Sequence, residues 1–93
     1  MPDGDMTRIG ARARKGDPDL ASRLIQLRRR VGSPWPLSQA AFAGRYGLSA
    51  GMVRDVEQCR VQPSRAFRLL VALIEDDPKH VAEIAARLAT EPR

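Results

Sequence analysis

The stretch SQAAFAGRYGLSAGMVRDVEQ, residues 38–58, has the pattern of two short helices joined by a tight turn. Gly47 can adopt a positive φ, which a sharp turn at the end of a helix requires. Ala43 stands four residues earlier and is small enough to let the helices approach closely, and Val53 stands six residues later on an apolar face. Ser49 can accept a hydrogen bond from a free N–H group of the next helix. The stretch therefore predicts two helices that meet at Gly47.

The spacing in this stretch is typical of a helix-turn-helix. We expect its helices over 39–46 and 50–59, with Ser38 and Ser49 as their N-caps. In this motif the second helix enters the major groove of DNA, while the first crosses the backbone. The stretch therefore indicates a function as well as a fold.

Three more helices are expected around the motif. Asp17-Pro18 and Asp77-Pro78 are start signals, since Asp is a favoured N-cap and Pro is favoured at the first helical position. Ser64 follows a proline break and can cap another helix, and apolar residues recur at helical spacing after each start. No segment has the pattern of a strand, so we predict an all-α domain of five helices. Two of these helices are expected over 18–31 and 78–90, and the third follows its cap Ser64 with Phe67, Leu70, Val71 and Ile74 on its inward face.

The domain organisation follows from length and local composition. A chain of 93 residues fits one small domain. Residues 1–16 lack apolar periodicity and contain three glycines and four basic residues. We therefore predict a flexible basic arm over 1–16 and a helix-turn-helix domain over 17–93. Such an arm can reach into a minor groove or along the DNA backbone, and the alternative is a terminus without a role of its own.

The net charge of +5 is unevenly distributed. Residues 1–74 contain 13 of the 16 Lys and Arg residues and 6 of the 11 Asp and Glu residues, which gives +7, whereas residues 75–93 give −2. A basic body favours a polyanion such as nucleic acid, and the acidic end favours a different contact. The run Arg28, Arg29 and Arg30 lies mostly off the apolar stripe of its helix and is expected to face phosphate or solvent.

Composition disfavours several other classes of protein. The longest apolar run, Leu69 to Ile74, is far too short to cross a bilayer, and the N-terminus lacks the order of a signal peptide. We therefore expect a cytoplasmic protein with no membrane contact. One cysteine, Cys59, and one histidine, His80, cannot form a disulfide or a zinc site within the chain. Because no catalytic motif is visible either, we expect no enzyme activity, no metal and no cofactor.

Two prolines stiffen the loop Gly32-Ser33-Pro34-Trp35-Pro36. Trp35 is the only tryptophan in the chain. We expect it to pack back onto the core as a lid, and the alternative is an exposed anchor for a partner.

The order LRRR…LSQAAFAGRYGLSAGMVRDVEQ…QPSRAFRLL resembles the Cro/phage-repressor (XRE-type) helix-turn-helix family. The likeness covers about residues 20–74 and includes the Leu-Ser-Gln opening, Gly47, Glu57 and the Pro63-Ser64 pair. It implies a lambda-repressor-like domain of five helices that binds double-stranded DNA.

The continuation LLVALIEDDP, residues 69–78, resembles HigA-like and MqsA-like antitoxins of toxin–antitoxin pairs. Those proteins are small dimers that repress their own operon and bind a toxin. The resemblance therefore implies a homodimer, autorepression and a toxin partner, and a repressor from a phage or mobile element is the alternative. The face of the last helix that carries Val81, Ile84 and Leu88 is expected to form a dimer or partner surface, unless it closes the core.

The predicted base contacts lie on the second helix of the motif. Arg54 is the strongest candidate, because a guanidinium can donate to O6 and N7 of guanine at once. Ala50 can contact a thymine methyl group, whereas Asp55 needs Arg54 or cytosine N4 as its partner near DNA. The predicted base contacts are Ala50, Gly51, Arg54, Asp55 and Gln58.

The predicted phosphate contacts surround that helix. The resemblance implies that Gln39 binds phosphate at the start of the first helix, where an amide donor and a helix N-terminus both suit an anion. Arg60 and Arg65 suit the same role by charge. Glu57 is expected to hold the loop after the second helix through backbone N–H groups. The predicted phosphate contacts are Gln39, Ser49, Arg60, Ser64 and Arg65.

A second hypothesis is a protein-interaction module built on the same scaffold. Ala50 and Gly51 offer DNA few polar groups, and Asp55 repels phosphate. These residues would suit a surface that binds a toxin or another regulator in place of DNA.

Overall fold

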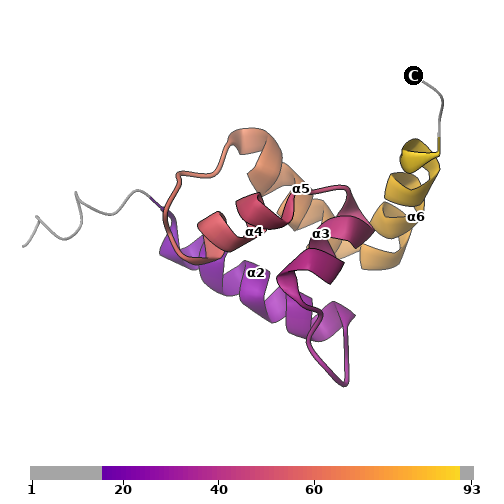
Figure 1. Ribbon diagram of the computed structural model, residues 1–93, viewed down its shortest axis with the longest axis horizontal. Helices are drawn as coiled ribbons and strands as arrows, with labels where there is room; N and C mark the ends of the chain where they lie inside the picture. The colour runs from indigo at the N-terminus through magenta and orange to yellow at the C-terminus, as the bar shows by residue number, and fades with distance from the viewer. Residues whose placement is uncertain (1–15, 91–93) are drawn as a thin grey trace, which may run out of the picture.

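A computed structural model describes residues 16–90 of the chain. Within that range it is built from helices and loops, with no strand (Figure 1). The helices are α2 (Pro18–Val31), α3 (Gln39–Tyr46), α4 (Ala50–Glu57), α5 (Arg65–Asp76) and α6 (Pro78–Ala89). The predicted all-α domain of five helices is confirmed, whereas the predicted arm over 1–16 lies outside the described residues except for Gly16. None of the five helices is long and apolar enough to cross a membrane.

Each helix begins where its cap signal predicts. In every case a side-chain oxygen of the N-cap residue accepts a hydrogen bond from the backbone N–H three residues later, which satisfies one of the free donors of the first turn. The N-caps are Asp17, Ser38, Ser49, Ser64 and Asp77.

The turn between α3 and α4 has the geometry expected of Gly47. Its backbone is left-handed, with φ 71° and ψ 29°, a conformation that costs glycine little. The N–H of Leu48 then donates to the carbonyl of Ala43 at 2.8 Å and closes the end of α3. Ala43 is buried and Val53 is fully buried, so the two helices pack closely across the turn.

The end of α4 differs from the prediction. The helix stops at Glu57, two residues earlier than expected, because Cys59 has a left-handed backbone with φ 57°. The N–H of Arg60 turns back to the carbonyl of Asp55 at 2.8 Å and so satisfies a free carbonyl of the last turn. Gly16 lies directly against this turn, where a Cβ atom would collide with the backbone of Cys59. The end of α6, at Ala89, agrees with the prediction to within one residue.

The core lies between α2, α3, α4 and α5. Phe42 and Tyr46, one turn apart on α3, pack on each other with ring centroids 4.8 Å apart. In contrast, α6 rests against α3 and α5 and has no fully buried side chain, although Val81 and Ala82 pack on the core. The core residues are Leu20, Leu24, Leu27, Phe42, Ala43, Tyr46, Val53, Val56, Phe67, Val71 and Ile74.

The predicted packing of Trp35 as a lid is wrong. Its side chain is 77% exposed, in the loop that projects from the helices between α2 and α3 (Figure 1). The loop is closed by its own backbone, since the N–H of Trp35 donates to Gly32 and the N–H of Leu37 donates to Arg28. Leu37 packs against the core at the end of this loop. The apolar position that closes the loop is therefore Leu37, and Trp35 stays in solvent.

Candidate nucleic-acid interface

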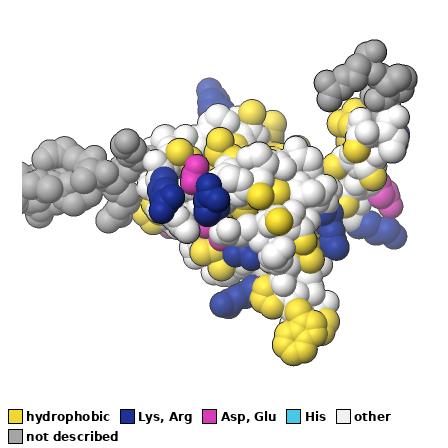
Figure 2. All heavy atoms as spheres, viewed as in Figure 1, with side chains coloured by type: hydrophobic (Ala, Val, Ile, Leu, Met, Phe, Trp, Pro, Cys, Tyr) yellow, Lys and Arg dark blue, Asp and Glu magenta, His cyan; other side chains and the backbone are white. Residues whose placement is uncertain are grey.

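One face of α4 and its end is accessible. Val53 and Val56 fix the opposite face in the core, where both are fully buried. The five predicted base-contact residues share the outer face because they follow helical spacing. Ala50, Arg54 and Gln58 are exposed, and Gly51 and Asp55 are half-buried. Figure 2 shows basic side chains beside an acidic one over this part of the surface.

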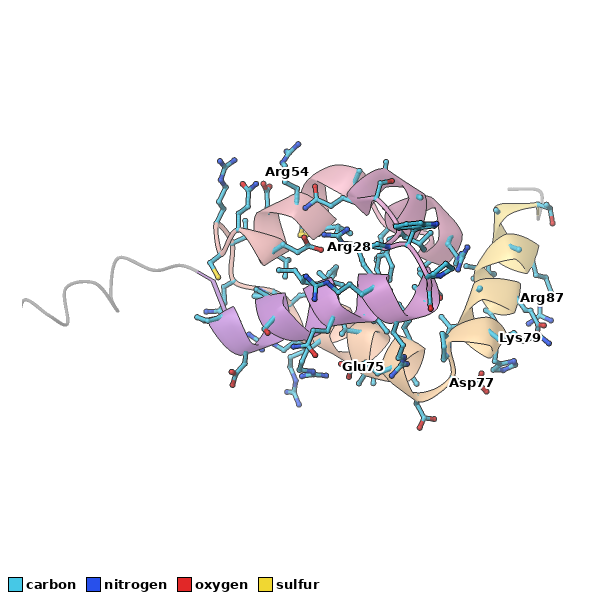
Figure 3. All side chains as sticks on the ribbon, turned by 90° about the horizontal axis from the view of Figure 1, so that it is seen from below. Arg28, Arg54, Glu75, Asp77, Lys79 and Arg87 are labelled. Carbon is cyan, nitrogen blue, oxygen red and sulfur yellow. The ribbon has the colours of Figure 1, made fainter. Side chains whose placement is uncertain are left out.

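Arg54 projects away from the helices on this face (Figure 3). Its Nε lies 3.6 Å from Oδ1 of the neighbouring Asp55, a loose pair whose members are both in contact with solvent. Its Nη2 lies close to Gly51: a Cβ atom added to that glycine would be 3.6 Å from Nη2. The guanidinium therefore keeps its Nη donors toward solvent, and Asp55 offsets part of its charge.

Gln39 is already engaged within the protein. Its Nε2 donates to Oε1 of Glu57 at 2.9 Å, and the side chain is half-buried. The same carboxylate accepts two hydrogen bonds from Arg28, whose Nη1 also donates to the carbonyl of Leu37 at 2.6 Å. One amide hydrogen of Gln39 remains for an anion, so the predicted phosphate contact is narrowed to a single side-chain donor.

The expected role of Glu57 is corrected by this network. Its carboxylate accepts from side chains of α2 and α3, and the loop after α4 is closed by backbone carbonyls. Arg28 is likewise bound to protein and is not a free phosphate or solvent contact. The sequence contains a signal that Arg28 is partly buried, because it follows Leu24 by four residues and so borders the apolar stripe of α2, but it contains no signal for the partner.

Of the remaining predicted phosphate contacts, Ser49 lies at the start of α4, Ser64 and Arg65 lie at the start of α5, and Arg60 lies in the loop between these helices. The hydroxyl oxygens of Ser49 and Ser64 accept the capping bonds from Met52 and Phe67, which leaves each hydroxyl hydrogen free to donate. Arg60 and Arg65 are both exposed, and neither side chain forms an ion pair within residues 16–90.

A second ion pair holds the loop that carries Arg60. Arg68 of α5 bonds to Asp17 and donates from Nη2 to Oε1 of Gln62 at 2.6 Å. The hydrogen bond from Arg68, supported by the N–H of Leu20, lowers the pKa of the Asp17 carboxyl group. The loop between α4 and α5 is thereby tied to the start of α2.

The exposed basic side chains Arg54, Arg60 and Arg65 thus lie on an all-α scaffold in which a tight turn at Gly47 joins α3 to α4. No protein-family model, curated protein or solved structure matches this chain.

Proposed function

We propose that the chain is a sequence-specific DNA-binding regulator that inserts α4 into the major groove. The observation that carries the proposal is the accessible outer face of α4, which presents Arg54. Arg60 follows the end of α4 and Arg65 begins α5, and neither of these two side chains forms an ion pair among the described residues. A short helix held by Val53 and Val56 on a compact core is a rigid way to present such a face.

Base recognition on this surface depends chiefly on Arg54. Its Nη groups can donate to guanine O6 and N7, and Ala50 can contact a thymine methyl group. Gly51 lets the backbone approach the base edges closely. Asp55 lies beside Nε of Arg54, and its carboxylate can accept a hydrogen bond from cytosine N4.

Phosphate binding on this surface would come from the first turn of α3 and from the loop between α4 and α5. The first turn of α3 offers two backbone N–H groups and the remaining amide hydrogen of Gln39, since the cap Ser38 occupies only the N–H of Ala41. Arg60 and Arg65 would neutralise further phosphates, and this charge would make binding depend on salt.

The proposed active form is a homodimer, because half-sites about one helical turn apart, roughly 34 Å, suit two copies of α4. An apolar surface of α5 and α6 supports it. Leu70, Ile84 and Leu88 line a groove of about 420 Å³ that these helices form with the end of α3. Leu69 and Leu73, one turn apart on α5, are also exposed. Exposed leucines on adjacent helices favour burial against a second copy.

The proposed biological role is repression of the chain's own operon in the cytoplasm, with a toxin as a further partner. The resemblance of residues 69–78 to antitoxins supports this role, and a repressor of a phage or mobile element uses the same surface. The decisive experiment is a gel shift with the DNA upstream of the gene at low salt. Retardation that survives excess unrelated DNA is expected, and its absence would refute the proposal.

A second candidate function is a protein-interaction module. The pairing of Arg54 with Asp55 and of Gln39 with Glu57 favours it, because each carboxylate occupies or offsets a group that would otherwise bind DNA. If the gel shift shows no retardation and a co-expressed toxin is retained by the chain, this function is the correct one.

A further inference from the structure

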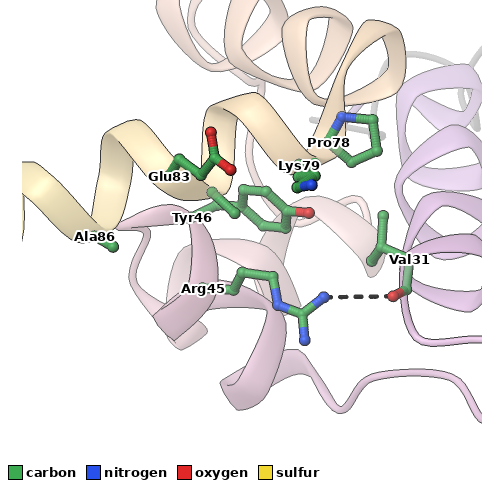
Figure 4. Close-up of a pocket in the computed structure, with 8 residues that line it drawn as sticks. Val31, Arg45, Tyr46, Pro78, Lys79, Glu83 and Ala86 are labelled. Carbon is green, nitrogen blue, oxygen red and sulfur yellow. Dashed lines mark hydrogen bonds between the residues drawn. The ribbon is translucent and has the colours of Figure 1, made fainter.

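The hydroxyl of Tyr46 lacks a hydrogen-bond partner within the described part of the chain. The residue is only 4% exposed, and its ring packs on Phe42. A buried tyrosine usually directs its hydroxyl to a partner, because an unmade hydrogen bond is costly. Figure 4 shows this hydroxyl pointing into a groove between α3 and α6. The groove therefore contains a donor that no described residue uses.

The groove itself is apolar at its base and basic at its rim. It has a volume of about 460 Å³ and is shallow and open to solvent. Arg45 comes from α3, and Lys79 and Glu83 come from successive turns of α6. The apolar lining consists of Val31, Pro78, Ala82 and Ala86.

The donors of the groove exceed its acceptors. Arg45 uses Nη1 for the carbonyl of Val31 at 3.3 Å, which leaves other guanidinium hydrogens free (Figure 4). Lys79 is exposed and forms no ion pair inside residues 16–90. Glu83 is the one acidic side chain of the lining, and it lies 4.0 Å from Nδ1 of His80. Tyr46, Arg45 and Lys79 together suit a carboxylate above an apolar base.

We propose that this groove binds an acidic side chain carried on an apolar segment of a partner protein. The cationic rim provides the charge complementarity, and the apolar base accommodates the neighbouring side chains. The groove follows successive turns of α6 and is open to solvent, which suits a peptide segment. The surface is separate from the outer face of α4, so this proposal does not depend on DNA binding.

The test uses the full chain labelled with nitrogen-15 and two synthetic peptides. The probe is acetyl-Ala-Leu-Glu-Leu-Ala-amide, and its control has Gln in place of Glu. Addition of the probe is expected to shift the amide signals of Tyr46, Lys79, Ala82 and Ala86. The Gln peptide should bind about 10-fold more weakly, because it lacks the charge.

Three variants locate the carboxylate. Tyr46→Phe removes only the hydroxyl, so we expect an unchanged melting temperature and about 5-fold weaker binding of the Glu peptide. Lys79→Gln should weaken it about 10-fold. Arg87→Gln is the matched control, since Arg87 is a basic residue on α6 outside the groove, and binding should not change.

Three results with the peptides would overturn the proposal. The first is equal amide shifts with both peptides, and the second is shifts centred away from α3 and α6. The third is unchanged binding of the Glu peptide by both single variants, Tyr46→Phe and Lys79→Gln. Binding of phenylacetate without binding of the Glu peptide would also overturn it, because the occupant would then be a small carboxylate. The gel shift is unaffected by any of these results, so failure here is distinguishable from failure of the DNA proposal.

Discussion

The carboxylate of Glu57 accepts hydrogen bonds from both Nε and Nη2 of Arg28, at 2.7 and 2.8 Å. The side chains of Glu57 and Arg28 are only 5% and 16% exposed, so this bidentate pair is largely shielded from solvent. It joins α4 to α2 and also orients Gln39 at the start of α3. One carboxylate thus joins three helices, α2, α3 and α4.

Replacing Glu57 by Ala should therefore be strongly destabilising. The variant leaves the Arg28 guanidinium buried without its counter-ion, which costs about 3 kcal/mol of unfolding free energy. Urea denaturation followed by circular dichroism measures the loss. Arg23→Ala is the control, because Arg23 pairs with Glu75 at an exposed site and should cost at most about 1 kcal/mol. Equal losses in the two variants would contradict the assignment.

Acid should weaken the fold through Asp17 and Glu75. Hydrogen bonds from Arg68 and Arg23 lower the pKa of these carboxyl groups from their ordinary values of 3.8 and 4.5. Because the folded pKa lies below the unfolded one, this stabilisation is complete above the ordinary pKa and is lost as pH falls through the folded pKa. We expect the urea midpoint to decrease as pH falls below about 4.5.

The control for the acid effect is the double variant Asp17→Asn, Glu75→Gln. Its urea midpoint should start lower and change less with pH, because neither position can then titrate. A decline as steep as that of the unmodified chain would show that other groups cause the acid sensitivity.

Arg54→Ala and Arg65→Ala should weaken DNA binding in different ways. Loss of Arg54 should cost about 1–3 kcal/mol on the preferred site and relax the choice of one base pair. Loss of Arg65 should weaken all sequences alike and reduce the salt slope by about 1. Fluorescence anisotropy on matched and mutated sites at several salt concentrations separates these effects. If both variants bind like the unmodified chain, α4 is not the helix in the groove.

Leu88→Glu should prevent self-association. Leu88 is 59% exposed at the edge of the apolar groove of α5 and α6, so a charge there would be buried only in a dimer. Sedimentation velocity should show a dimer for the unmodified chain and a monomer for the variant, with equal helix content. Trp35→Ser is the control, since it removes an exposed apolar side chain from the loop between α2 and α3. A Leu88→Glu variant that remains dimeric would exclude this surface.

Helix starts could be predicted because their signals are local. Asp17-Pro18, Ser38, Ser49, Ser64 and Asp77-Pro78 each act within one turn of the backbone, and all five helices begin there. Helix ends are harder to predict. Cys59 takes the left-handed position that usually favours glycine, so no residue type announces the end of α4.

The candidate site was less predictable because its key contacts cross the chain. Arg28 and Glu57 are 29 residues apart, and Gln39 reaches the same carboxylate from a third helix. Neither local propensity nor charge pattern specifies such a pair. Trp35 is predicted to be buried because it is apolar. Burial also requires that the loop bring the side chain to the core, and in this loop it is Leu37 that packs there.

The absence of any fully buried side chain in α6 has a kinetic consequence. A helix attached by partial burial alone can detach without opening the core formed by α2 to α5. Hydrogen exchange in α6 should therefore be faster than in α2 and α5, under conditions where the rest stays folded. Whatever binds along α6 would slow that exchange, and the last helix would act as a local reporter of occupancy.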